Sequence, residues 1–242
     1  MPTDGPRGWG APLHARVHDD ARVGPGTTVL DLGCGTGEFA AAAVARGAVL
    51  TGIDRDPAAV ATAAATVPSA TFAVGDVHDP PPGRFDVVAA VQVLMHAANP
   101  LVVLRAAAAR GVLVSVTTWG TEAECDVRAF GEAVAPWLQP RRPPAGPPPV
   151  TDPDRLLQLA RLAGLGEPVL AEVVCPFHYQ DADALVAPLF ETGIGRHAIN
   201  RAGPGAVREA VLQRCAEFAQ PDGSYVLHNR FRVLTGRGCR PG

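Results

Sequence analysis

The sequence predicts an α/β protein with a doubly wound, mostly parallel sheet. Short apolar runs alternate with Ala-rich stretches through the first half of the chain, which is the pattern of strands and helices in turn. Acid-Pro or Asn-Pro pairs mark where Ala-rich stretches begin, as expected for helix starts. The 242 residues are 47% hydrophobic and 19% charged, which is enough apolar chain to bury a core.

The first half of the chain is predicted to form right-handed βαβ units. Asp56-Pro57 and Asn99-Pro100 supply the N-cap and first helical residue of two helices. The predicted strands are 28–32, 48–53, 70–74, 85–91 and 111–117, and the predicted helices are 37–46, 57–66 and 99–109.

The regular alternation stops near residue 118. A helix is predicted at 121–138, followed by a proline-rich segment at 140–149 that lacks amide donors and serves either as a stiff spacer or as a lid. Beyond it, helices are predicted at 152–163, 181–193 and 204–219, and strands at 168–177 and 223–235. We expect one domain spanning residues 1–242.

Composition excludes several classes of function. The chain has 21 basic residues, all of them Arg, so Schiff-base lysines and Walker lysines are excluded. The net charge of −3 disfavours nucleic acid as a partner. Five scattered cysteines without a CxxC pair, and no apolar leader or long apolar run, predict a cytoplasmic protein with no membrane partner. His14 and His18 lack a third ligand, so no metal site is predicted. The oligomeric state is not predicted.

A glycine-rich turn follows the first strand. Gly33, Gly35 and Gly37 lack a Cβ atom, which lets a ligand approach the backbone amides of this segment. The third glycine comes one residue too early for a dinucleotide fingerprint, and Asp31 would repel a pyrophosphate. A nicotinamide oxidoreductase is therefore disfavoured, whereas a ligand with a cationic amine is favoured.

Two further acidic residues stand at strand ends on the same edge of the predicted sheet. Asp54 ends the second strand, where a carboxylate reaches ribose hydroxyls. Asp76 follows the third strand and suits an exocyclic amine such as adenine N6, with Val77 packing on the ring. Acceptors for an amine, a ribose and an adenine, in strand order, describe S-adenosylmethionine.

These motifs resemble those of class I S-adenosylmethionine-dependent methyltransferases, of the small-molecule type similar to ubiquinone and menaquinone biosynthesis enzymes. The resemblance implies a seven-stranded sheet in the order 3-2-1-4-5-7-6. It also implies an antiparallel last strand, helices on both faces and a helical insertion before that strand. Residues 28–117 would form the cofactor-binding half, with substrate-side elements at 119–150 and 178–222.

The resemblance also implies roles for individual residues. Asp31 and the glycine turn would hold the methionine end, and Val91 and Gln92 would face the sulfonium and the amino-acid part. The cofactor-binding candidates are Asp31, Gly33, Cys34, Gly35, Gly37, Asp54, Arg55, Asp76, Val77, Val91 and Gln92.

Methyl transfer relies chiefly on proximity and alignment, and a general base helps when the acceptor carries a proton. His96, after the fourth strand, is the first candidate for this base, although a structural role is an equal alternative. His178 and Tyr179 are weaker candidates. We expect methyl transfer to O, N or C of a small molecule, a secondary metabolite if the composition reflects a GC-rich bacterial genome, with S-adenosylhomocysteine as product. The alternative is a cofactor-binding cyclase or ligand-binding module that transfers no methyl group.

Overall fold

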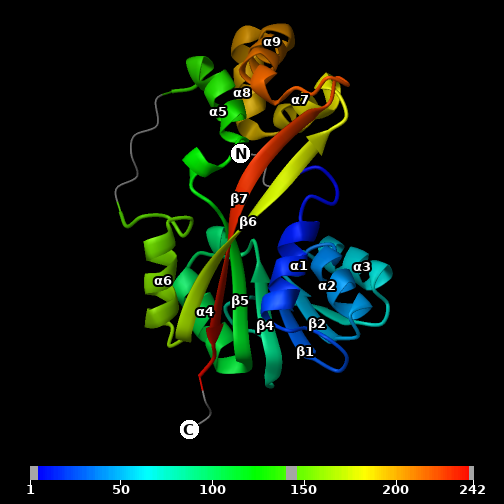
Figure 1. Ribbon diagram of the computed structural model, residues 1–242, viewed down its shortest axis with the longest axis vertical. Helices are drawn as coiled ribbons and strands as arrows, with labels where there is room; N and C mark the ends of the chain where they lie inside the picture. Colours follow the sequence, from blue (N-terminus) through cyan, green and yellow to red (C-terminus); the bar gives the residue numbers. More distant parts are fainter. Residues whose placement is uncertain (1–4, 140–145, 240–242) are drawn as a thin grey trace. The chain divides into compact units, whose positions relative to one another are not determined.

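The protein, a computed structural model that describes residues 5–139 and 146–239, contains the predicted seven-stranded sheet (Figure 1). Its strand order is β3-β2-β1-β4-β5-β7-β6. The paired strands among β1 to β5 run parallel, and β7 runs antiparallel to β5. The fold prediction is therefore confirmed. The strands are β1 (Thr28–Leu32), β2 (Val49–Asp54), β3 (Thr71–Val74), β4 (Phe85–Val91), β5 (Gly111–Trp119), β6 (Gly166–Tyr179) and β7 (Tyr225–Arg237).

The helices begin where capping side chains predict. Asp56, Asn99 and Asp152 each accept a hydrogen bond from a first-turn amide, and a proline follows each of them. In the described part of the chain the helices are α1 (Ala11–Asp20), α2 (Glu38–Ala45), α3 (Pro57–Thr66), α4 (Pro100–Arg110), α5 (Arg128–Val134), α6 (Pro153–Leu162), α7 (Ala182–Phe190), α8 (Gly193–Ala202) and α9 (Pro204–Arg214). Among the described residues, no helix combines the length and the apolar character needed to cross a bilayer.

The chain divides into two compact units. The core unit consists of the described residues of Pro12–Trp119, Pro148–Val173 and Phe231–Gly242. The accessory unit consists of those of Met1–Ala11, Gly120–Pro147 and Val174–Arg230. That the chain forms one domain stays a prediction.

The core unit buries both faces of its central parallel strands β1 and β4. Leu30 and Leu32 of β1 belong to one buried cluster with Leu104 of α4 and Leu156 of α6. Figure 1 shows α4 and α6 on one side of these strands and α1, α2 and α3 on the other. Because successive strand residues point to opposite faces, Asp31 faces away from this apolar cluster. Full burial of a leucine side chain stabilises the fold by about 1.5–3 kcal/mol.

The helix predicted at 121–138, in the accessory unit, is wrong. The chain instead forms a short 3-10 turn at Glu122–Glu124, then α5, then another 3-10 turn at Ala135–Trp137. Between the first turn and α5, Cys125 forms an isolated β-bridge with Asn229 of β7. This pairing across the fold extends the backbone at Cys125 and overrides the local helical preference.

Two more helical predictions need correction. The predicted helix 181–193 corresponds to α7, and α8 follows it where none was predicted. Glycines at the first and third positions of α8 lower its helical propensity. A Cβ on Gly195 would lie 1.9 Å from the carbonyl oxygen of Leu189, so glycine is required there. The predicted helix 204–219 ends at Arg214 and continues as a 3-10 turn at Ala216–Phe218. Part of the 140–149 segment lies outside the described residues.

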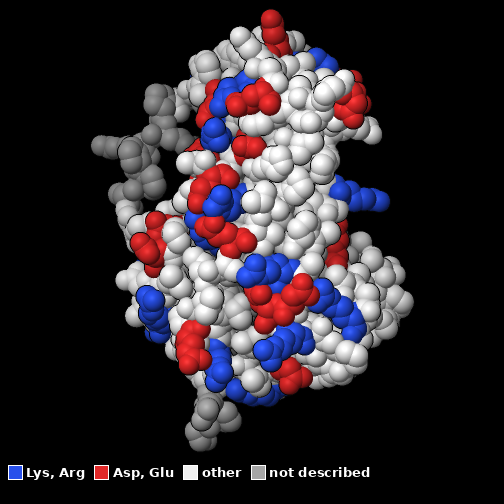
Figure 2. Space-filling model, in the orientation of Figure 1, with Lys and Arg blue, Asp and Glu red and all other residues white. Residues whose placement is uncertain are grey.

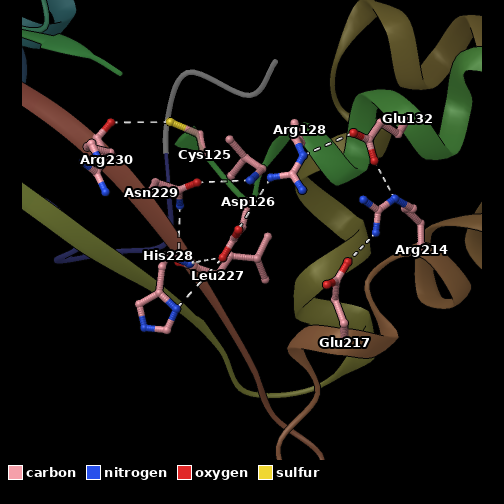
Figure 3. Close-up of polar contacts among 11 residues, drawn as sticks. Cys125, Asp126, Arg128, Glu132, Arg214, Glu217, Leu227, His228, Asn229 and Arg230 are labelled. Carbon is pink, nitrogen blue, oxygen red and sulfur yellow. Dashed lines mark hydrogen bonds and ion pairs between the residues drawn. The ribbon is translucent and has the colours of Figure 1, made fainter. Parts of the chain in front are cut away.

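Polar contacts connect the elements of the accessory unit (Figure 3). Arg214 of α9 pairs with Glu132 of α5 and with Glu217. Asn229 is fully buried, accepts a hydrogen bond from the Val127 amide and donates one to the Leu227 carbonyl. Exposed ion pairs contribute little, whereas a buried amide that loses its partners is costly, so Asn229 is the stronger constraint. On the face drawn in Figure 2, Arg side chains are intermixed with Asp and Glu.

Candidate functional site

A cavity of about 700 Å³ opens in the core unit at the carboxyl ends of β1 to β4. This is the edge at which parallel α/β sheets bind ligands, and its volume suits a nucleoside-sized molecule. It brings together many of the residues predicted from the sequence. The predicted residues that line it are Gly33, Asp54, Arg55, Asp76, Val77, Val91, Gln92 and His96.

The turn between β1 and α2 requires its glycines. Gly33, Gly35 and Gly37 have φ values of 77°, 50° and 90°, in the left-handed region that favours glycine. A Cβ on Gly33 would lie 2.6 Å from Cγ2 of Val93, a residue that also lines the cavity. The Gly33 backbone therefore packs directly against the Val93 side chain at the β4 end of the cavity.

Asp54 is held in a fixed orientation at the end of β2. One carboxylate oxygen accepts from the Gly35 amide at 2.9 Å, and the other accepts from the Asp56 amide at 3.0 Å. A carboxylate oxygen can accept two hydrogen bonds, so each oxygen keeps capacity for a ligand hydroxyl. The arrangement ties the glycine turn to the second strand and leaves two acceptors at the cavity.

Asp76 follows β3 and is exposed. Its Oδ1 accepts from the His78 amide at 2.9 Å, and the His78 Nδ1 lies 2.7 Å from the same oxygen. These two hydrogen bonds lower the pKa of the Asp76 carboxyl, which keeps it ionised near neutral pH. Sequence reasoning missed His78, because only its distance from Asp76 distinguishes it from any other loop histidine.

Asp31 is buried and does not itself line the cavity. Neither carboxyl oxygen has a hydrogen-bond partner within the described part of the chain. Its sheet neighbours Gly52 and Ala89 offer no polar side chain. Burial, and secondly the charge of Asp54, raises the pKa of Asp31 to about 7. An unpartnered buried carboxyl beside a ligand cavity favours a ligand that brings a cation or donor.

Cys34, between the first two glycines of the turn, is buried and its thiol is protonated. Burial, followed by the charges of Asp31 and Asp54, raises the pKa of this thiol to about 12. Cys34 thus acts as a small apolar side chain, and it stays outside the cavity lining together with Gly35 and Gly37.

Gln92, directly after β4, has a left-handed backbone with φ of 58°, which is uncommon for a residue other than glycine. Its amide N–H and its side-chain Nε2 both donate to the Thr117 hydroxyl at 3.0 Å. Thr117 is fully buried on β5, opposite Val91. Strained backbones persist where the surroundings enforce them, often at ligand sites. Sequence reasoning missed Thr117, although its place at the end of a predicted neighbouring strand was a usable signal.

The three candidate bases lie in different places. His96 closes the 3-10 turn Leu94–His96 after β4, is exposed and lines the cavity. His178 and Tyr179 belong to the accessory unit. His178 is exposed, whereas Tyr179 is buried in T-shaped contact with Phe130, and burial raises its phenol pKa. The structure therefore groups only His96 with the cavity.

His14 and His18 of α1 both pack against Phe39 of α2. His18 stacks on Phe39 and His14 meets the same ring edge-on. Burial lowers the pKa of each imidazole to about 4. Over the ranges that the structure describes, no cluster of three His, Cys, Asp or Glu side chains could hold a metal ion.

Comparison with known proteins identifies the family. The sequence profile of the methyltransferase domain family matches residues 11–166. The chain belongs to the methyltransferase domain family. Ubiquinone biosynthesis O-methyltransferase of Pseudomonas paraeruginosa is 38% identical over 102 residues, 39% of this chain and 44% of that protein. The enzyme of the same name from Xanthomonas campestris is 38% identical over 118 residues, 43% of this chain and 48% of that protein. The chain thus matches about half the length of these relatives.

Solved structures share the fold. A protein from Bacillus halodurans C-125 superposes with a TM-score of 0.60 at 16% identity, covering 93% of this chain and 97% of that one. The [4+2]-cyclase SpnF has a TM-score of 0.57 at 21% identity, covering 95% and 81%. Phosphoethanolamine N-methyltransferase 2 of Haemonchus contortus has a TM-score of 0.57 at 18% identity, covering 98% and 54%. The predicted class I methyltransferase fold is confirmed, and such fold likeness alone does not decide the reaction.

Proposed function

We propose that the protein binds S-adenosylmethionine in the cavity at the ends of β1 to β4 and transfers its methyl group to a small molecule, releasing S-adenosylhomocysteine. The observation that carries this proposal is the placement of Asp54 and Asp76 at consecutive strand ends around one cavity, beside the glycine turn. The family match supports methyl transfer.

The residues present fit this cofactor. Asp54 offers two acceptors to a ribose diol, and Asp76 offers Oδ2 to an exocyclic amine. Gly33 lines the cavity, and it has to be glycine because a side chain there would strike Val93. The buried carboxyl of Asp31, which has no hydrogen-bond partner among the described residues, favours an ammonium group nearby. The ribose diol, the exocyclic amine and the ammonium group of the cofactor thus each have a candidate partner in the core unit.

When bound, the cofactor supplies a methyl carbon already activated by its sulfonium. The protein then has to orient the acceptor and exclude competing geometries, because alignment accounts for much of the rate. Val91 and Gln92 line the β4 side of the cavity, where Thr117 fixes the Gln92 backbone and amide. If the acceptor atom carries a proton, the His96 imidazole lines the cavity and is the first candidate to take it. The names of the curated relatives make an oxygen acceptor the first to test.

Binding of S-adenosylhomocysteine by isothermal titration calorimetry tests the proposal. Asp54→Asn should weaken binding by about tenfold or more, because hydrogen bonds to a charged acceptor are worth about 1.5–3 kcal/mol. Asp56→Asn is the matched control, since Asp56 only caps α3 and an asparagine also caps. A wild-type protein that does not bind, or an Asp54→Asn variant that binds equally well, contradicts the proposal.

The second candidate function is a protein that binds the cofactor but transfers no methyl group, and the cyclase on this fold is the observation that raises it. The family match favours methyl transfer over this alternative. Incubation with labelled cofactor and a panel of phenols, amines and acidic carbon compounds separates the two, because only methyl transfer moves the label to the acceptor. With a hydroxyl acceptor, His96→Asn should lower kcat while leaving cofactor affinity unchanged. Cytoplasmic location and the lack of a nucleic-acid partner stay predictions.

A further inference from the structure

His78 is a cavity residue to which the proposed function assigns no role. It lies in the loop after β3, two residues beyond Asp76, and both side chains line the cavity. The backbone amide and the ring Nδ1 of His78 converge on the same atom, Oδ1 of Asp76, at 2.9 and 2.7 Å. One residue therefore contributes two contacts to one carboxylate oxygen.

The chemistry of this pair places the ring proton. An ionised carboxylate only accepts hydrogen bonds, so the Nδ1 that faces it must be the donor. In the neutral ring Nε2 is then the unprotonated nitrogen, and it is enclosed without a hydrogen-bond partner among the residues that the structure describes. The imidazole is thus oriented through its Nδ1 end.

The two contacts at Oδ1 also fix the position of Oδ2, the other carboxylate oxygen of Asp76. With Oδ1 occupied by two donors, the rotation of the Asp76 side chain is restricted, and Oδ2 remains an acceptor. The Asp76 side chain is 68% exposed, so without His78 little else would limit its rotamers. A fixed acceptor distinguishes a ligand amine from a ligand carbonyl better than a freely rotating one, because a carbonyl facing it leaves two acceptors opposed.

We propose that His78 is a positioning residue that fixes the Asp76 carboxylate so that Oδ2 accepts the exocyclic amine of a purine, making the cavity selective for adenine over hypoxanthine. This inference rests on the proposed function, which supplies the adenine. His78 acts through Asp76 and takes no part in the chemical step. Loss of the donor at its Nδ1 position should change discrimination between the two bases, and binding of the rest of the cofactor should change little.

Two substitutions separate the ring nitrogens. His78→Asn places an amide N–H close to the position of Nδ1, and His78→Gln places one close to the position of Nε2, which has no partner. Asp76→Asn is the reference for complete loss of the acceptor. The probes are S-adenosylhomocysteine and S-inosylhomocysteine, which differ in whether the base presents an amine or a carbonyl. Calorimetry gives the ratio of their dissociation constants for each protein.

Wild type should favour the adenine compound, and His78→Gln should reduce that preference about three- to tenfold, as loss of one hydrogen bond predicts. His78→Asn should keep the preference within about twofold of wild type. A merely structural role for His78 would weaken both ligands together and leave the ratio unchanged. Equal ratios in the Asn and Gln variants, or no preference in wild type, overturn the inference. Failure of wild type to bind either compound overturns the proposed function itself.

Discussion

Asp31→Asn should stabilise the ligand-free protein at alkaline pH, which is unusual for a substitution in a buried strand. Burial and the charge of Asp54 raise the pKa of Asp31 from 3.8 to about 7, so ionisation of this group opposes folding. A rise of that size corresponds to about 4 kcal/mol at a pH above both values. Asparagine has nearly the same shape and no charge, so it removes this cost.

The pH dependence follows from the sign of the shift. Below pH 3.8 the carboxyl is protonated in both states and costs nothing. Between 3.8 and about 7 the unfolded chain ionises while the folded protein does not, so stability falls as pH rises. Above pH about 7 the loss of stability stays constant. The advantage of Asp31→Asn over wild type should therefore be about 2–3 kcal/mol larger at pH 8 than at pH 5.

Urea unfolding at the two pH values measures this difference directly. Asp86→Asn is a control on the same sheet, because the pKa of Asp86 is shifted in the opposite direction. Asp86 accepts hydrogen bonds from the Thr28 amide and hydroxyl. These bonds lower the pKa of Asp86, so its contribution is present above the unfolded value and is lost on acidification. Asp86→Asn should thus be less stable than wild type at pH 8. An Asp31→Asn variant that is less stable than wild type at pH 8, or equally shifted at both pH values, refutes the reasoning.

Three further outcomes follow from the site and the accessory unit. Gly33→Ala should abolish measurable S-adenosylhomocysteine binding in calorimetry, because Gly33 has a left-handed φ and a Cβ there would lie 2.6 Å from Val93. Binding at wild-type affinity would contradict the requirement for glycine at this position. Thr117→Val should weaken cofactor binding, whereas Thr117→Ser should bind as wild type does, because the Thr117 hydroxyl is the group that holds Gln92. Equal affinities for the two variants would exclude a role of this hydroxyl in binding. Asn229→Leu should lower the free energy of unfolding by about 1–3 kcal/mol, because Asn229 is fully buried. Arg214→Ala should change the urea midpoint little, because the Arg214 side chain is partly exposed. The reverse order would contradict the weight given to burial.

The parts of the structure governed by local rules could be predicted from the sequence. Proline pairs with capping side chains located α3 and α4 to within a residue, because an N-cap satisfies its own first turn. The glycine spacing located the turn after β1, because a left-handed backbone needs glycine.

What could not be predicted depends on contacts between distant segments. The Cys125–Asn229 bridge breaks the predicted helix, yet it joins residues more than a hundred positions apart. The Thr117 contact with Gln92 exists only because β5 lies beside β4. The pairing of His78 with Asp76 is local in sequence, but its meaning depends on the cavity that both residues line.

The position of β7 has a consequence for how the chain folds as it is synthesised. Strands β1 to β5 can assemble in the order in which they leave the ribosome, since each pairs with strands already made or soon to follow. β6 cannot, because its place in the sheet lies beyond β7, which is made about fifty residues later. Until then the outer side of β5 and the whole of β6 are unpaired edges, the kind of surface that templates aggregation. We expect nascent chains stalled before residue 225 to depend on chaperones, although the strands that border the cavity, β1 to β4, are already complete.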